Sequence, residues 1–177
     1  MPLGNVKRHS AELLQDLGFK MGQVTAALQN FDHPALHRDF HWDLANGLDI
    51  IQKYEALILD PELRQLIQRL RAQFEHYTAP ILSALRQSVI HNDANNFNLL
   101  VGDGGHDLYT RNQSIVGLID FGDMVHSYTI SDLAVAIAYA ILNKPDPLAT
   151  AAQIVKGFHA ACPLMDDELA ALFGLVT

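Results

Sequence analysis

The sequence predicts a mainly α-helical protein with a small β ribbon in its middle, an α+β fold. Apolar residues recur at steps of three and four before residue 88 and again after residue 128, which is the period of a helix with one buried face. Between these parts the apolar runs are short and rich in β-branched residues, as is typical of strands. A chain of 177 residues can bury a sizeable core in one domain. We therefore expect a single domain over 1–177, helical over 1–87, with the ribbon at 88–128 and C-terminal helices at 129–177.

The first helix is predicted over residues 10–29. Its apolar side chains fall on one face, and Ser10 is a suitable N-cap residue at its start. Gly18 and Gly22 are four residues apart within it. We expect another element to pack closely against this pair of glycines.

Two further helices are predicted before residue 87. Pro34 interrupts the helical period, so we expect residues 31–42 to form a loop or short turns. A second helix begins near Asp43. A third begins at Pro61, because Asp-Pro-Glu is a strong helix start. Its inner stripe is expected to consist of Leu63, Leu66, Ile67, Leu70 and Phe74.

Three strands are predicted in the middle of the chain, at 88–91, 98–101 and 114–120. "GDGG" at 102–105 is the expected turn between the second and the third strand. The segment 133–142, "LAVAIAYAIL", is apolar almost all round and is expected to be a buried central helix. Two shorter helices are predicted near 147–160 and 166–175.

The composition argues against several classes of protein. A net charge of −8 does not favour binding to nucleic acid, which depends on clustered Lys and Arg. No apolar run approaches the roughly 20 residues that span a bilayer, and the first residues lack the apolar segment of a signal peptide. We therefore expect a cytoplasmic protein without a membrane partner. Its single cysteine, Cys162, is expected to be a small core residue.

Two polar motifs stand at the ends of predicted strands. "VIHNDANNFNLLV" at 89–101 contains the pattern H-x-D-x-x-x-x-N, and "IDFGD" ends the third strand. Asn and Asp often cap turns in loops, which is the plainer interpretation. The combination also suits phosphoryl transfer, which needs a carboxylate to orient the attacking hydroxyl and ligands for Mg²⁺ beside the nucleotide phosphates.

These motifs carry a resemblance to a known family. Residues 86–142 resemble the catalytic core of the aminoglycoside phosphotransferase and choline kinase superfamily, whose members have a protein-kinase-like fold. "HNDANNFNLLV" and "LIDFGDMVHSYTISDLAVAIAYA" look most like the hydroxylysine kinase branch, and the resemblance extends more weakly to residues 31–44. It implies that the chain has the fold of the C-terminal lobe of such a kinase.

The resemblance assigns a role to each residue that matches the family's motifs. Asp93 matches the catalytic aspartate, which orients the substrate hydroxyl or accepts its proton. Asn98 and Asp120 match the Mg²⁺ ligands beside ATP. His91 matches a residue that braces the catalytic loop, and Asp132 matches an aspartate that supports this loop from the following helix.

The sequence departs from the family in two places. Many members carry Gly where this chain has Asn92. The family's N-terminal lobe, with a strand-borne Lys and a helix Glu, would need on the order of 100 residues before Ser10. The expectation is therefore a C-terminal lobe whose N-terminal nucleotide-binding lobe is absent. We expect this fragment to be inactive by itself, because phosphoryl transfer depends on positioning and charge neutralisation.

Three more residues are candidates for contacting the substrate. Trp42, Asp123 and Tyr128 are aromatic or acidic, and such groups suit an ammonium-bearing molecule. For Trp42 we favour a half-buried position beside a helix cap at Asp43. A cap or surface role for Asp123 is at least as well supported as a substrate or metal contact.

The histidines at positions 33, 37 and 41 offer a competing metal site. Their four-residue interval would align them on a helix, but Pro34 weakens that alignment, so we do not favour zinc. A metal-dependent phosphohydrolase is a further alternative. It is weakened because the two polar motifs contain only His91, whereas such sites use several His ligands.

The sequence thus supports two main hypotheses. The first is the C-lobe of an ATP-dependent kinase that phosphorylates a hydroxyl of a small amino alcohol, a hydroxylated amino acid or an aminoglycoside-like molecule. The second is a non-catalytic truncated or pseudo-kinase module for binding or assembly. In that case we expect self-association through the face left by the missing lobe.

Overall fold

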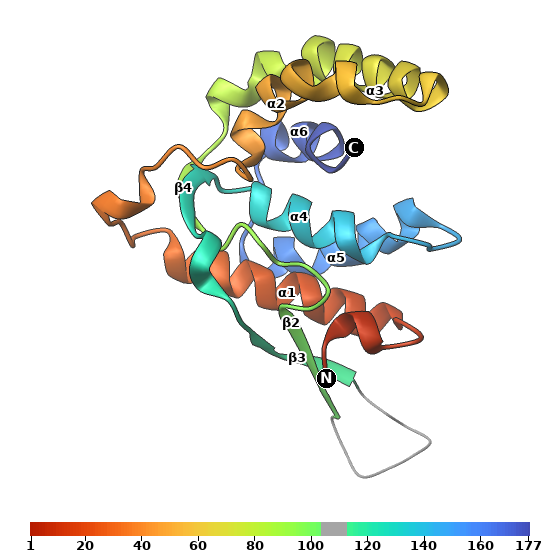
Figure 1. Cartoon of the computed structure of the whole chain (residues 1–177). Coiled ribbons are helices and arrows are strands. Elements are labelled where there is room, and N and C mark those ends of the chain that lie inside the picture. Colours follow the sequence, from red (N-terminus) through yellow and green to blue (C-terminus); the bar gives the residue numbers. More distant parts are fainter. Residues whose placement is uncertain (104–112) are drawn as a thin grey trace.

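The computed structural model describes residues 1–103 and 113–177, and Figure 1 shows their arrangement. Helices dominate, and the strands form small antiparallel sheets, so the predicted α+β class is confirmed. Among the described residues, no helix is both long and apolar enough to cross a membrane. The helices are α1 (Ala11–Leu28), α2 (Gly47–Tyr54), α3 (Pro61–Gln73), α4 (Ser131–Ala140), α5 (Pro147–Ala161) and α6 (Asp166–Val176).

The strands pair differently from the predicted single ribbon. They are β1 (Gln87–Ile90), β2 (Leu99–Asp103), β3 (Gln113–Leu118) and β4 (Val125–Tyr128). β1 pairs with β4 and β2 pairs with β3, each pair antiparallel. The strand β4 was not predicted, and residues 91–98 link two sheets instead of closing a hairpin. β3 ends before Asp120, and the turn predicted at 102–105 lies partly outside the described residues.

The core forms where α1 and α5 cross. A Cβ on Gly18 would lie 1.8 Å from the backbone oxygen of Ile154, and a Cβ on Gly157 would lie 1.9 Å from that of Gln15. Only glycine allows two helix backbones to approach so closely. The expected close packing at Gly18 is therefore confirmed, and Gly157 supplies the matching position on α5.

The central helix and the cysteine also lie where the sequence predicts. Helix α4 buries seven of its ten residues, and Cys162 is a buried member of the core.

The starts of α1 and α3 are fixed by capping side chains. The Ser10 side chain accepts the N–H of Leu13, and Asp60 accepts those of Glu62 and Leu63. These caps confirm the predicted starts of α1 and α3.

The inner stripe predicted for α3 is partly wrong. Leu63 is 46% exposed and Leu66 is 42% exposed. The reason is the position of the helix: α2 and α3 lie at one end of the molecule, with β2 and β3 at the other and α4 between them (Figure 1). The other members of the stripe line a cavity between α2, α3 and α6, and Phe74 also packs against the core. They are Ile67, Leu70 and Phe74.

Candidate active site

The loop over 91–98 is fixed by one buried carboxylate. Asp132, near the start of α4, accepts the backbone N–H of His91 at 3.1 Å and that of Asn92 at 2.8 Å, one on each oxygen. Its side chain is fully buried. Burial raises the pKa of Asp132, and the two N–H groups oppose this shift by favouring the charged form. Asp132 thus lies where its expected supporting role requires it.

The His91 ring ties the loop to the end of β3. Its Nδ1 accepts the N–H of Asp93 at 3.2 Å, so Nε2 carries the proton that is donated to the Ile119 oxygen at 3.1 Å. The ring is buried and meets the Phe121 ring edge-on, with centroids 4.8 Å apart. This single neutral tautomer satisfies both nitrogens. The arrangement is that of a brace, as expected for His91.

Asn92 has a left-handed backbone, with φ of 68°. Asn tolerates this conformation better than most residues, and glycine adopts it freely. The structure therefore accounts for the departure at this position, because both residue types fit the same turn. The Asn92 side chain also donates to the backbone oxygen of Trp42 at 3.3 Å, which links the loop to residues 31–42.

Two amides hold the Asp93 carboxylate in place. Asn95 donates to its Oδ1 at 2.8 Å, and Asn98 donates to its Oδ2 at 2.7 Å and to its backbone oxygen at 2.9 Å. Asp93 is half-buried at the edge of a cavity. Because the Asn98 nitrogen is bonded to Asp93, its Oδ1 is the side-chain atom that can coordinate a metal ion.

Asp120 lies beside Asn98 through the pairing of β2 with β3. Leu99 is opposite Leu118, and the next residue, Ile119, donates its N–H to the Asn98 oxygen at 3.0 Å. Asp120 has a left-handed φ of 64° and an exposed side chain. Asp, like Asn, adopts this conformation more readily than most residues, so the chain can turn sharply here. An amide oxygen and a carboxylate form a hard donor set that fits Mg²⁺.

Arg38 braces the turn that follows Asp120, a role that the sequence did not reveal. Its guanidinium donates to the backbone oxygens of Gly122 at 2.9 Å and Met124 at 3.0 Å, and it lies over the Phe40 ring at 4.3 Å. No local pattern marks this role, because a lone Arg in a loop is ordinary. The only signal was the weak resemblance over residues 31–44.

A cavity of about 450 Å³ opens at Asp93. Trp42 and Asp123 line it together with Asn92 and Asn95, so two of the three substrate candidates lie there. Trp42 is 70% exposed, which corrects the expected half-buried position. Helix α4 adds Tyr139, which sequence reasoning missed because it lies within an apolar helical run.

The third substrate candidate, Tyr128, and the expected cap residue, Asp43, are not among the residues that line this cavity. Tyr128 is opposite Gln87 at the end of β4 and packs against the core, where burial raises its pKa. Asp43 is buried and caps the turn over Leu44–Asn46 by accepting the N–H of Ala45 at 3.0 Å. It also accepts the hydroxyl of Ser127, which ties the turn to β4. The expected cap at Asp43 is therefore confirmed.

The three histidines make separate contacts. His33 accepts the N–H of Ala35, His37 contacts Asp32 at 2.7 Å, and His41 meets the Trp42 ring edge-on. Within residues 1–103 and 113–177, no group of three or more His, Cys, Asp or Glu side chains is placed to hold a metal ion.

Comparison with known proteins agrees with this geometry. The chain matches the phosphotransferase enzyme family over residues 2–170. It is 33% identical over 171 residues to the hydroxylysine kinase of Xenopus laevis, and the match covers 93% of this chain and 46% of that protein. The chain therefore spans about half the length of this curated relative.

Solved structures share the fold. A microcompartment-associated aminopropanol kinase matches with a TM-score of 0.65 and 22% identity over 94% of this chain and 51% of its own. An amicoumacin kinase in complex with AMP-PNP, Ca²⁺ and Ami matches with a TM-score of 0.61 and 15% identity, over 94% of this chain and 48% of its own. Because the family match covers nearly the whole chain, this protein belongs to the phosphotransferase enzyme family.

Proposed function

We propose that this chain supplies the hydroxyl-orienting and metal-holding groups of an ATP-dependent phosphotransferase. Its acceptor is a hydroxyl of a small amino alcohol, a hydroxylated amino acid or an aminoglycoside-like molecule. The observation that carries the proposal is the Asp93 carboxylate, which Asn95 and Asn98 hold at the edge of a cavity large enough for such a molecule.

Asp93 is the residue that acts on the acceptor. Its carboxylate orients the attacking hydroxyl and accepts its proton. Asn98, through Oδ1, and Asp120 would hold Mg²⁺. The metal, when bound, neutralises charge on the nucleotide phosphates. His91 and Asp132 fix the loop, so that Asp93 needs little reorganisation at the moment of transfer.

The same cavity has groups that suit an amine. Asp123 provides a carboxylate, while Trp42 and Tyr139 provide aromatic faces. Aromatic rings and carboxylates attract ammonium groups, and the attraction grows when the ligand is removed from water. These residues favour a hydroxylated amine over a neutral sugar or a carboxylic acid.

We further propose that the chain corresponds to the C-terminal lobe of such a kinase and turns over little substrate when isolated. Its match to about half of the related hydroxylysine kinase supports this assignment. A lobe that binds the nucleotide phosphates would complete the site. The reason is that phosphoryl transfer gains nearly all its rate from positioning and electrostatic stabilisation.

An exposed apolar surface favours a second candidate, a binding or assembly module. Four large side chains around the end of β3 and the catalytic loop are more than 40% exposed. Such exposure is common at surfaces that another chain or domain covers. The residues are Phe97, Val116, Ile119 and Phe121.

Replacement of Asp93 in an active kinase that contains this chain tests the function. We expect Asp93→Asn to lower kcat by roughly 10²- to 10⁴-fold, the scale for losing a general base. The KM for ATP should stay nearly unchanged. Asp167→Asn, an exposed change at the start of α6, is the matched control. Equal activity of Asp93→Asn and the control would contradict the proposed role of Asp93.

A further inference from the structure

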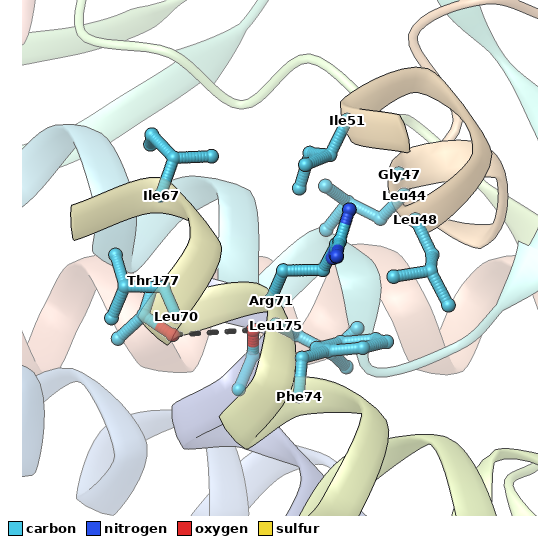
Figure 2. A pocket seen from close by; sticks show the side chains of 11 residues that line it. Leu44, Gly47, Leu48, Ile51, Ile67, Leu70, Arg71, Phe74, Leu175 and Thr177 are labelled. Carbon is cyan, nitrogen blue, oxygen red and sulfur yellow. Dashed lines mark hydrogen bonds between the residues drawn. The ribbon is translucent and has the colours of Figure 1, made fainter. Parts of the chain in front are cut away.

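A second cavity, of about 160 Å³, lies between α2, α3 and the end of α6 (Figure 2). In α2 and α3, which the structure describes in full, no side chain is completely buried. The apolar faces of these two helices instead enclose the cavity. The apolar side chains that line it include Leu48, Ile51, Ile67, Leu70, Phe74 and Leu175.

This second cavity adjoins the cavity at Asp93. Leu44 and Leu175 line both of them. Leu44 lies in the short turn before α2 and is half-buried, while Leu175 lies in the last turn of α6 and is nearly buried. These two leucine side chains therefore form the boundary between the cavity at Asp93 and the second cavity.

Arg71 has the charged side chain of the second cavity, and carboxylates outside the lining pair with it. Figure 2 shows Arg71 among the apolar side chains. Its guanidinium contacts Glu55 at 2.8 Å and Glu75 at 3.6 Å. Two carboxylates thus surround one guanidinium. The other side chains named in this lining are apolar, so an apolar group that enters the cavity loses only its contact with water.

We propose that the second cavity is the specificity compartment of the acceptor site, and that it takes an apolar substituent of the hydroxylated amine. This inference rests on the proposed function and narrows its substrate class. A dry cavity of roughly 150 Å³ accommodates a molecule the size of benzene. The favoured acceptor therefore carries an apolar group of up to about six carbons beside its amine and hydroxyl.

A series of amino alcohols tests this proposal by binding to the chain as it stands, measured by ligand-observed NMR. The probes are 2-aminoethanol, 2-amino-1-butanol and 2-amino-1-hexanol. We expect affinity to rise about two- to fourfold per added methylene, since each buried methylene contributes up to about 0.8 kcal/mol. The rise should end once the cavity is full.

Gly47 offers a variant that fills the cavity. It lines the cavity, and a Cβ at this position meets nothing within 4 Å. Gly47→Leu should therefore fold, abolish the gain for the longer probes and leave 2-aminoethanol binding within about twofold. Gly47→Ala is the matched control and should retain most of the gain.

Each outcome bears on a different part of the proposal. Equal affinity across the series, or the same rise in Gly47→Leu as in the wild type, would overturn the specificity compartment and leave the proposed function standing. Equal 2-aminoethanol affinity in the wild type and Asp93→Asn would count against the proposed function itself. The compartment is supported if affinity rises along the series in the wild type and in Gly47→Ala but not in Gly47→Leu.

Discussion

Helices α1 and α3 carry apolar residues at the same period, yet they use them differently. Leu13 and Leu17 of α1 are fully buried against α4 and α5, while Leu63 and Leu66 of α3 remain more than 40% exposed. The difference follows from what each helix packs against. The comparison shows that the apolar period identifies a helix with an apolar face, but not whether this face packs against the core or lines a cavity.

The core and the pair α2 and α3 also contribute to the site in different ways. The core holds the loop over 91–98 through Asp132 on α4, so stability and loop geometry are linked there. The pair α2 and α3 contributes to cavity walls and is open to substitution. We therefore expect changes in the core to be costly for folding, and matched changes in α2 or α3 to be mild.

The largest difference is expected for glycine replacements. Gly18→Val should destabilise the protein by about 4 kcal/mol or more, because its Cβ would overlap the backbone of α5 at Ile154. Gly47→Ala in α2 should instead be neutral or stabilising by up to about 1 kcal/mol, since its added methyl meets open space. Urea unfolding followed by circular dichroism compares the two. Similar midpoints for the two variants would refute the contrast.

A smaller difference is expected for carboxylates that accept backbone N–H groups. Asp132→Ala leaves two buried N–H groups without their acceptor and should cost about 2–5 kcal/mol. Asp60→Ala removes an exposed cap of α3 with the same number of N–H contacts and should cost only about 1 kcal/mol. Both losses can be measured by urea unfolding. A cost at Asp132 no larger than that at Asp60 would contradict a role for burial.

Sequence reasoning succeeded where the determinants are local. Ser10 and Asp60 mark helix starts because a cap acts within three residues, and Gly18 marks a close contact because only glycine fits there. The strand β4 was missed because it pairs with a distant strand, β1. The paired residues Ile90 and Val125 are 35 positions apart in the sequence, and such pairing leaves no local signal. For the site, Asp93 and Asp120 follow a motif, whereas Tyr139 enters the cavity only through the placement of α4.

The smallest expected effect concerns Arg38, which connects the loop over 31–42 with the turn after Asp120. Arg38→Gln removes the charge from its two contacts with backbone oxygens, and we expect the turn to loosen without unfolding, at a stability cost of about 1 kcal/mol.

The affinity of Arg38→Gln for Mn²⁺, used as a spectroscopic substitute for Mg²⁺, should fall by about 10-fold because Asp120 is less well positioned. Arg69→Gln, an exposed change on α3, is the control. Electron paramagnetic resonance in the presence of ATP measures free Mn²⁺ in solutions of each variant. Unchanged Mn²⁺ affinity in Arg38→Gln would show that Arg38 stabilises the turn without positioning the metal ligand.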